Sequence, residues 1–102
     1  MRYRYALGEV LREIRTEQRR TLRWVSDRSS VALGYLSEVE RGQKEISSEL
    51  LDNVAEALGL PTSRLVIEAG YKMSLADDLY LPNELRYESV IKTSDENPIS
   101  LV

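Results

Sequence analysis

Residues 21–42 have the sequence TLRWVSDRSSVALGYLSEVERG, the most informative stretch of the chain. Thr21 is a residue that readily caps the start of a helix, and Ser29-Ser30 interrupts the pattern as a turn would. Gly42 stands where a left-handed residue is favoured just after a second helix. The stretch therefore predicts two short helices joined by a turn of about three to four residues.

Apolar residues along the chain recur at the i, i+3, i+4, i+7 spacing of amphipathic helices. They predict a helix over residues 5–19, another that begins at Ser47 or Ser48, and another over residues 61–70. No alternation of period two is long enough to indicate a sheet, so the predicted fold class is all-α. The residues expected to face inward are Leu7, Val10, Leu11, Ile14, Leu22, Val25, Ser26, Leu36, Val39, Leu51, Val54, Ala55, Leu58, Leu65, Val66 and Ala69.

The C-terminal part of the chain is less regular. Gly70 is expected to end the preceding helix, and Ser74 can cap a further short helix. We therefore divide the chain into a helical body (1–70), an extension (71–92) and a polar tail (93–102) that is expected to fray.

The composition of the 102 residues argues against an enzyme. The chain contains neither cysteine nor histidine, which excludes thiolate ligands and removes the commonest general base and metal ligand. We expect no catalytic residue, no metal and no cofactor. Apolar runs are too short to span a membrane, so the protein is expected in the cytoplasm, on the nucleoid when it is bound to DNA.

Charge is distributed unevenly along the chain. Residues 1–44 contain ten basic and six acidic residues, a net charge of +4, whereas residues 45–102 contain four basic and eleven acidic residues, a net charge of −7. The first segment is suited to phosphate contacts, while the second would face elsewhere. The alternative is chance clustering of solvated charges.

The segment LSEVERG (36–42) matches the pattern LS-x-x-E-x-G, and LREIR (11–15) and LLDNVAEALGL (50–60) flank it in the right order. The chain resembles the Cro/repressor-like helix-turn-helix family, of the xenobiotic-response-element type, over residues 7–67. The stretch GYLSEVERGQKEISSELL (34–51) is similar more narrowly to the Clp gene regulators (ClgR). The resemblance implies a five-helix, lambda-repressor-like DNA-binding domain with a short C-terminal helical extension.

The resemblance also implies roles for individual residues. Arg15 and Glu40 correspond to a buried ion pair that orients the recognition helix, unless Glu40 is simply an exposed helix carboxylate. In the major groove, Glu38 would accept a hydrogen bond from cytosine and Leu33 would meet a thymine methyl group. Gly34 would allow close approach of the backbone to DNA, or else only loosen the helix start.

Phosphate contacts fix the register of a protein on DNA without reading its sequence. The candidates are Arg23, Tyr35, Ser37, Arg41 and Lys44. For each basic residue the alternative is a solvated surface charge.

The chain departs from the family pattern at four positions. Ser30 replaces the common turn glycine, Ala32 replaces a capping Ser or Thr, and Leu22 replaces a polar Gln. Trp24 is unusual in its position, where it would either pack against the first helix or mark an exposed contact surface. These departures put base readout in doubt, but not the fold.

The extension contains more apolar residues than a solvated tail needs. They indicate a homodimer interface, with packing over the first and fifth helices as the alternative. A two-fold dimer would place two recognition helices about 34 Å apart on a palindromic operator in double-stranded DNA. The interface residues would be Leu75, Leu79, Tyr80, Leu81 and Leu85.

The predicted function is a transcription regulator, which the narrower resemblance makes an activator of Clp, ATP-dependent protease and stress genes. Further candidate partners are RNA polymerase and, through the apolar C-terminal end at residues 99–102, a Clp-type protease; simple disorder is the alternative for that end. Two other functions stay open. One is an antitoxin that binds a toxin and represses its own operon, and the other is an interaction module that does not bind DNA.

Overall fold

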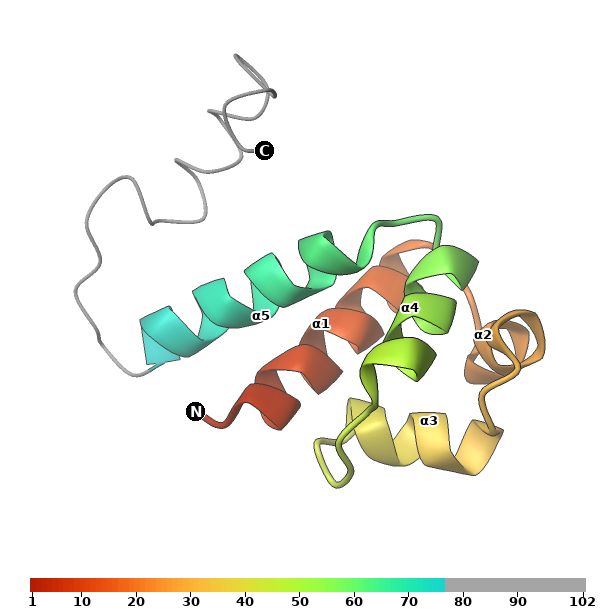
Figure 1. Cartoon of the computed structure of the whole chain (residues 1–102), viewed down its shortest axis with the longest axis horizontal. Coiled ribbons are helices and arrows are strands. Elements are labelled where there is room, and N and C mark those ends of the chain that lie inside the picture. The colour runs from red at the N-terminus through yellow and green to blue at the C-terminus, as the bar shows by residue number, and fades with distance from the viewer. Residues whose placement is uncertain (77–102) are drawn as a thin grey trace, which may run out of the picture.

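The computed structural model describes residues 1–76, which form five helices and no strand within that range (Figure 1). The predicted all-α, five-helix fold is confirmed. None of the helices in this part of the chain is long and apolar enough to cross a membrane. The helices are α1 (Tyr3–Glu17), α2 (Leu22–Ser29), α3 (Leu33–Glu40), α4 (Ser48–Ala57) and α5 (Thr62–Ala76).

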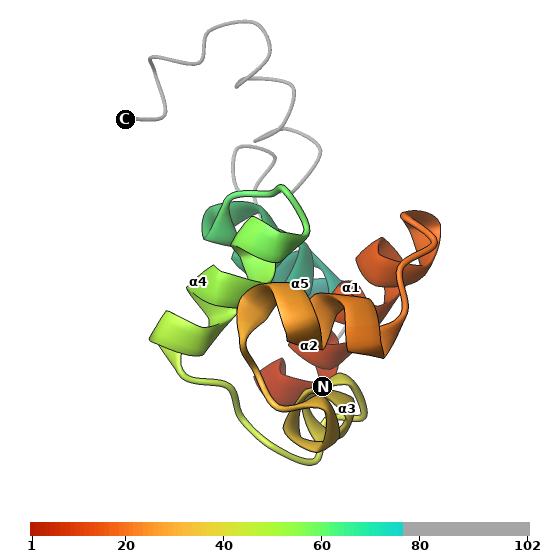
Figure 2. The ribbon, with the colours of Figure 1, turned by 90° about the vertical axis from the view of Figure 1, so that its right-hand side faces the viewer.

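The core lies where the apolar stripes of the helices meet around α1. Helix α5 runs beside α1, while α2 and α3 lie together at the other side of the molecule (Figures 1 and 2). Burying these stripes is the main favourable term in folding so short a chain. The buried apolar residues are Ala6, Leu7, Val10, Leu11, Ile14, Val25, Val31, Leu36, Val39, Leu51, Val54, Ala55, Leu58, Leu65 and Ala69.

Local hydrogen bonds fix where two of the helices begin. The Thr21 hydroxyl accepts a hydrogen bond from the Trp24 backbone N–H at 3.0 Å, so Thr21 caps α2 as predicted. The Ser47 hydroxyl accepts one from the Leu50 N–H at 3.2 Å, which identifies Ser47 rather than Ser48 as the cap of α4. Each cap satisfies an N–H that the helix itself cannot pair.

The predicted end of the fifth helix was wrong. Helix α5 continues through Gly70 to Ala76, and Ser74 lies inside it, with its hydroxyl donating to the Tyr71 carbonyl oxygen at 2.8 Å. One glycine inside a helix costs only about 1 kcal/mol. Packing of α5 along α1 offsets this cost, and Lys72 adds a 2.9 Å ion pair with Glu13 of α1.

The prediction that Val66 faces inward was also wrong, since its side chain is 42% exposed. Leu65 and Ala69 occupy the inward row of α5, and a residue one position along a helix points about a quarter turn away. Leu75 lies in the last turn of α5 and is 63% exposed. The other expected interface residues, Leu79, Tyr80, Leu81 and Leu85, lie outside the described residues.

Candidate nucleic-acid interface

The turn between α2 and α3 is held by side chains of α2. The Ser26 hydroxyl donates to the Val31 carbonyl oxygen at 2.6 Å, and the Ser29 hydroxyl accepts from the Val31 N–H at 3.3 Å. Ser30 has the left-handed backbone conformation, with φ of 60°, that many family members give to a glycine. The strain of a non-glycine residue there is about 1–2 kcal/mol. The hydrogen bonds around the turn keep the angle between the two helices despite this cost.

Helix α3 begins without a side-chain cap. Its N-cap is Ala32, which has no group to accept a hydrogen bond from the first turn. Its C-terminal end is better defined, because Gly42 has φ of 75° and its N–H bonds to the Val39 carbonyl oxygen at 3.0 Å. Both features agree with the expectations from the sequence.

An ion pair fixes α3 to α1. Arg15 Nε and Nη2 donate to the two oxygens of the Glu40 carboxylate at 2.7 and 2.9 Å. The side chains are only 13% and 6% exposed. The hydrogen bond to Glu40 raises the pKa of Arg15 above its ordinary value, so this guanidinium stays charged. The structure thus brings together the two residues that the resemblance paired.

The same guanidinium reaches a third element. Arg15 Nη1 donates to the Arg20 carbonyl oxygen at 2.9 Å, in the loop that leads into α2. One side chain therefore connects α1, the start of the α2–α3 unit and the end of α3. Planar, bidentate pairs of this kind hold geometry better than a lysine pair would.

The outward face of α3 is open. Gly34 is exposed, and a Cβ added to it would meet nothing within 4 Å. Leu33 and Glu38 are half-buried on the same helix, and the Glu38 carboxylate makes no ion pair within residues 1–76. Both side chains therefore keep part of their surface accessible.

The polar residues of α3 and the following loop are partly engaged with each other. The Tyr35 hydroxyl donates to the Glu45 carbonyl oxygen, and Arg41 Nη1 donates to the Ser37 hydroxyl. Arg41 Nη2 also lies 3.4 Å from Gln43 Oε1. A phosphate contact by Arg41 would therefore replace bonds to neutral groups, which are weaker than bonds to an anion.

Trp24 of α2 is stacked with two arginine side chains, one from the loop before the helix and one from its last turn. Its ring lies 4.0 Å from the Arg20 guanidinium carbon and 4.6 Å from that of Arg28. The indole is half-buried and also packs against the core. Trp24 is therefore not simply packed against the first helix, nor simply an exposed contact surface, which were the two alternatives that the sequence left open. Together with the exposed Arg23, the stack adds three basic side chains to the surface at α2.

Comparison with known proteins identifies the family. The helix-turn-helix domain family matches residues 6–65, more than half of the chain. The chain belongs to this family of DNA-binding domains. The transcriptional regulator ClgR of Mycobacterium tuberculosis is 54% identical to it over 76 residues, which cover 74% of this chain and 68% of that protein.

Solved structures agree with this identification. A crystal structure of the clp gene regulator ClgR from Corynebacterium glutamicum matches 74% of this chain and 97% of its own, with 48% identity and a TM-score of 0.69. A second structure of that regulator matches 96% of this chain and 97% of its own, with 38% identity and a TM-score of 0.73. This helix-turn-helix protein is thus a DNA-binding transcription regulator, a class that is not enzymatic.

Three residues of this helix-turn-helix protein were missed from the sequence. Arg28 follows Trp24 by four residues on α2, a spacing that would have indicated stacking on one helix face, whereas Arg20 lies in the loop before α2. Gly8 lies in α1 opposite α3, where an added Cβ would come within 2.6 Å of two carbonyl oxygens. A lone glycine in an otherwise helical segment was its only signal.

Proposed function

We propose that the chain is a homodimer that binds a palindromic operator and activates genes for Clp-type and other ATP-dependent proteases and for the stress response. The observation that supports it best is the open outward face of α3, oriented by the Arg15–Glu40 pair. Identity of 48% with the clp gene regulator ClgR from Corynebacterium glutamicum supports the choice of clp genes as targets.

In this proposal the face of α3 reads bases. Glu38 accepts a hydrogen bond from cytosine N4, and Leu33 meets a thymine methyl group. Gly34, with open space over it, lets the helix backbone lie close to the groove floor. With so few polar groups, the readout also depends on the shape of the DNA.

Phosphate contacts position the helix on the DNA. We assign them to Arg23 on α2, to Tyr35, Ser37 and Arg41 on or next to α3, and to Lys44 in the loop. Arg23, Arg41 and Lys44 are exposed, and none of them forms an ion pair with a carboxylate in residues 1–76. Such contacts make affinity fall steeply with salt concentration.

The dimer interface in this proposal begins at the end of α5. Leu75 is 63% exposed there, so its side chain is available to a second copy of the chain. The proposed interface continues with Leu79, Tyr80, Leu81 and Leu85. RNA polymerase is the proposed partner at the promoter, and the C-terminal tail is a proposed recognition site for a Clp-type protease.

The proposal is tested by selecting bound sequences from random DNA with the purified full chain, while its mass is measured in solution. We expect a palindromic consensus and twice the chain mass. Glu38→Ala should relax the preference at one base pair in each half-site, and Arg41→Ala should weaken binding to all sequences alike. The matched control is Glu17→Ala, at the exposed end of α1. An unchanged consensus with Glu38→Ala would refute the base contact, and a non-palindromic consensus would refute the dimer.

A further inference from the structure

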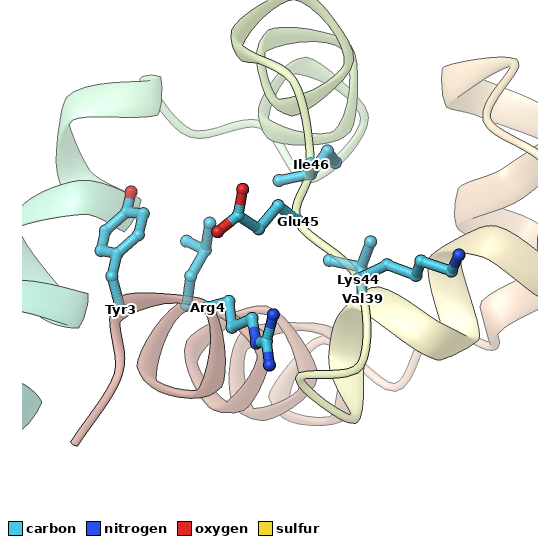
Figure 3. Close-up of a pocket in the computed structure, with 7 residues that line it drawn as sticks. Tyr3, Arg4, Val39, Lys44, Glu45 and Ile46 are labelled. Atoms are coloured by element: carbon cyan, nitrogen blue, oxygen red, sulfur yellow. The ribbon is translucent and has the colours of Figure 1, made fainter.

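A cavity of about 190 Å³ lies between the N-terminal turn of α1 and the loop that follows α3 (Figure 3). Leu7 of α1, Val39 of α3 and Ile46 of the loop form its apolar wall. Its polar rim has residues from the same elements. The cavity is therefore built from segments that are far apart in the sequence, and Lys44 is the one lining residue to which the proposed function gives a role.

Arg4, which lines this cavity, has an unmet hydrogen-bonding requirement. Its Nε is buried and has no hydrogen-bond partner among the described residues. The guanidinium carbon lies 5.7 Å from the centre of the Tyr5 ring, which offers no acceptor oxygen to Nε. A buried donor without a partner costs about 1–3 kcal/mol, and more when it is charged. Arg4 also forms no ion pair with a carboxylate of residues 1–76, so its guanidinium is available to an acceptor in the cavity once the side chain turns toward it.

The other polar residues of the rim would affect a bound anion in different ways. Burial raises the pKa of Tyr3, so its phenol stays a neutral hydrogen-bond donor at physiological pH. Figure 3 shows Lys44 extending away from Tyr3 and Arg4, and the Glu45 carboxylate extending toward Tyr3. Glu45 is exposed, so it can swing into solvent when another carboxylate enters.

We propose that this cavity binds a small organic acid, with its carboxylate at Arg4 and a compact apolar body against Leu7, Val39 and Ile46. The apolar wall supplies affinity through burial, while the donor of Arg4 selects a carboxylate over an uncharged group. Typical ligand pockets measure about 300–1,000 Å³, so this smaller cavity admits only a small ligand.

The cavity is coupled to the DNA-binding face by its own walls. Val39 belongs to α3, and the backbone of Glu45 accepts the hydrogen bond from Tyr35 of α3. A bound anion also reduces the positive potential next to Lys44, a proposed phosphate contact. Ligand and DNA therefore oppose each other, each lowering the affinity of the other by the same factor. This coupling rests on the proposed function, whereas binding of the acid does not.

Binding is tested with benzoate as the probe and benzyl alcohol as its uncharged match, titrated into the ¹⁵N-labelled full chain. Benzoate should shift the Arg4 Nε–Hε signal and the amides of Val39 and Ile46 in a saturable way, with at least tenfold weaker binding of benzyl alcohol. Arg4→Gln should bind benzoate and benzyl alcohol with similar affinity. The control variant Arg12→Gln, on an exposed part of α1, should keep the preference for benzoate. Glu45→Gln, which removes a competing carboxylate, should bind benzoate more tightly.

Three results would overturn the site. The first is that the shifts do not saturate by about 20 mM benzoate, which would mean a binding free energy weaker than about 2.3 kcal/mol. The second is equal binding of benzoate and benzyl alcohol. The third is that Arg4→Gln keeps the selectivity for benzoate. Ile46→Phe serves as an independent variant because it fills the cavity without changing a charge. It should abolish the benzoate shifts while the other amide signals remain those of the folded chain.

The coupling is tested on the selected operator, at constant ionic strength with chloride replacing benzoate. Benzoate should lower the DNA affinity of the unmodified chain and leave that of Arg4→Gln unchanged. Saturable benzoate binding with unchanged DNA affinity would overturn the coupling. If the chain bound no DNA sequence, the proposed function would fail while the benzoate titration still reported on the site.

Discussion

The contact between α1 and α3 at Gly8 gives the sharpest test of the fold. A Cβ on residue 8 would lie 2.5 Å from the Val39 carbonyl oxygen and 2.6 Å from that of Glu40. Both oxygens are backbone atoms of α3, so no side chain can rotate to make room. Gly8→Ala should push α3 away from α1 and lower the free energy of unfolding.

The size of this effect follows from the distances. Restoring an ordinary contact of 3.4 Å requires a movement of about 0.9 Å. Overpacking of this kind costs about 1–3 kcal/mol, and we expect the upper end because the obstacle is backbone. Alanine recovers about 1 kcal/mol of helix propensity, which leaves a net loss of about 2 kcal/mol. In a domain of this size that lowers Tm by about 10 °C.

Gly34→Ala is the matched control, because a Cβ there would meet nothing within 4 Å. It lies in the first turn of α3, so it should raise the free energy of unfolding through helix propensity by no more than about 1 kcal/mol. Urea denaturation followed by circular dichroism measures both variants, and we expect Gly8→Ala to be less stable than Gly34→Ala by about 2–3 kcal/mol. Equal stability of Gly8→Ala and Gly34→Ala would refute the close approach of the two helices.

Three further perturbations test other contacts. Glu40→Ala leaves Arg15 without its partner and should cost about 3 kcal/mol in urea denaturation; a loss below about 0.5 kcal/mol, typical of surface pairs, would contradict the role of the pair. Trp24→Ala should lower Tm more than Trp24→Phe, because phenylalanine keeps a ring for the two guanidinium groups, and equal Tm values would argue against the stack. The hydrogen bond with Glu13 raises the pKa of Lys72 above its unfolded value. The resulting stabilisation is complete below about pH 10 and is lost as the pH rises through the pKa of Lys72 in the folded chain. Lys72→Met should therefore lower the free energy of unfolding, measured in urea, only at pH values below that pKa.

Features that depend on neighbouring residues could be predicted from the sequence. The caps at Thr21 and Ser47 and the left-handed Gly42 involve bonds over three or four residues, so residue type alone indicates them. The inward positions of α1 followed in the same way from the helical period. The family pattern at residues 36–42 added the pairing of Arg15 with Glu40, which local spacing does not contain.

Features that depend on how two helices meet could not be predicted in this way. The continuation of α5 past Gly70 depends on its packing along α1, which outweighs a weak local stop signal. The unpaired Nε of Arg4 and the cavity beside it exist only because the loop after α3 returns to the start of α1. Capping and helical period are properties of adjacent residues, whereas distances such as the 2.5 Å at Gly8 arise from the crossing of two helices that no short segment encodes.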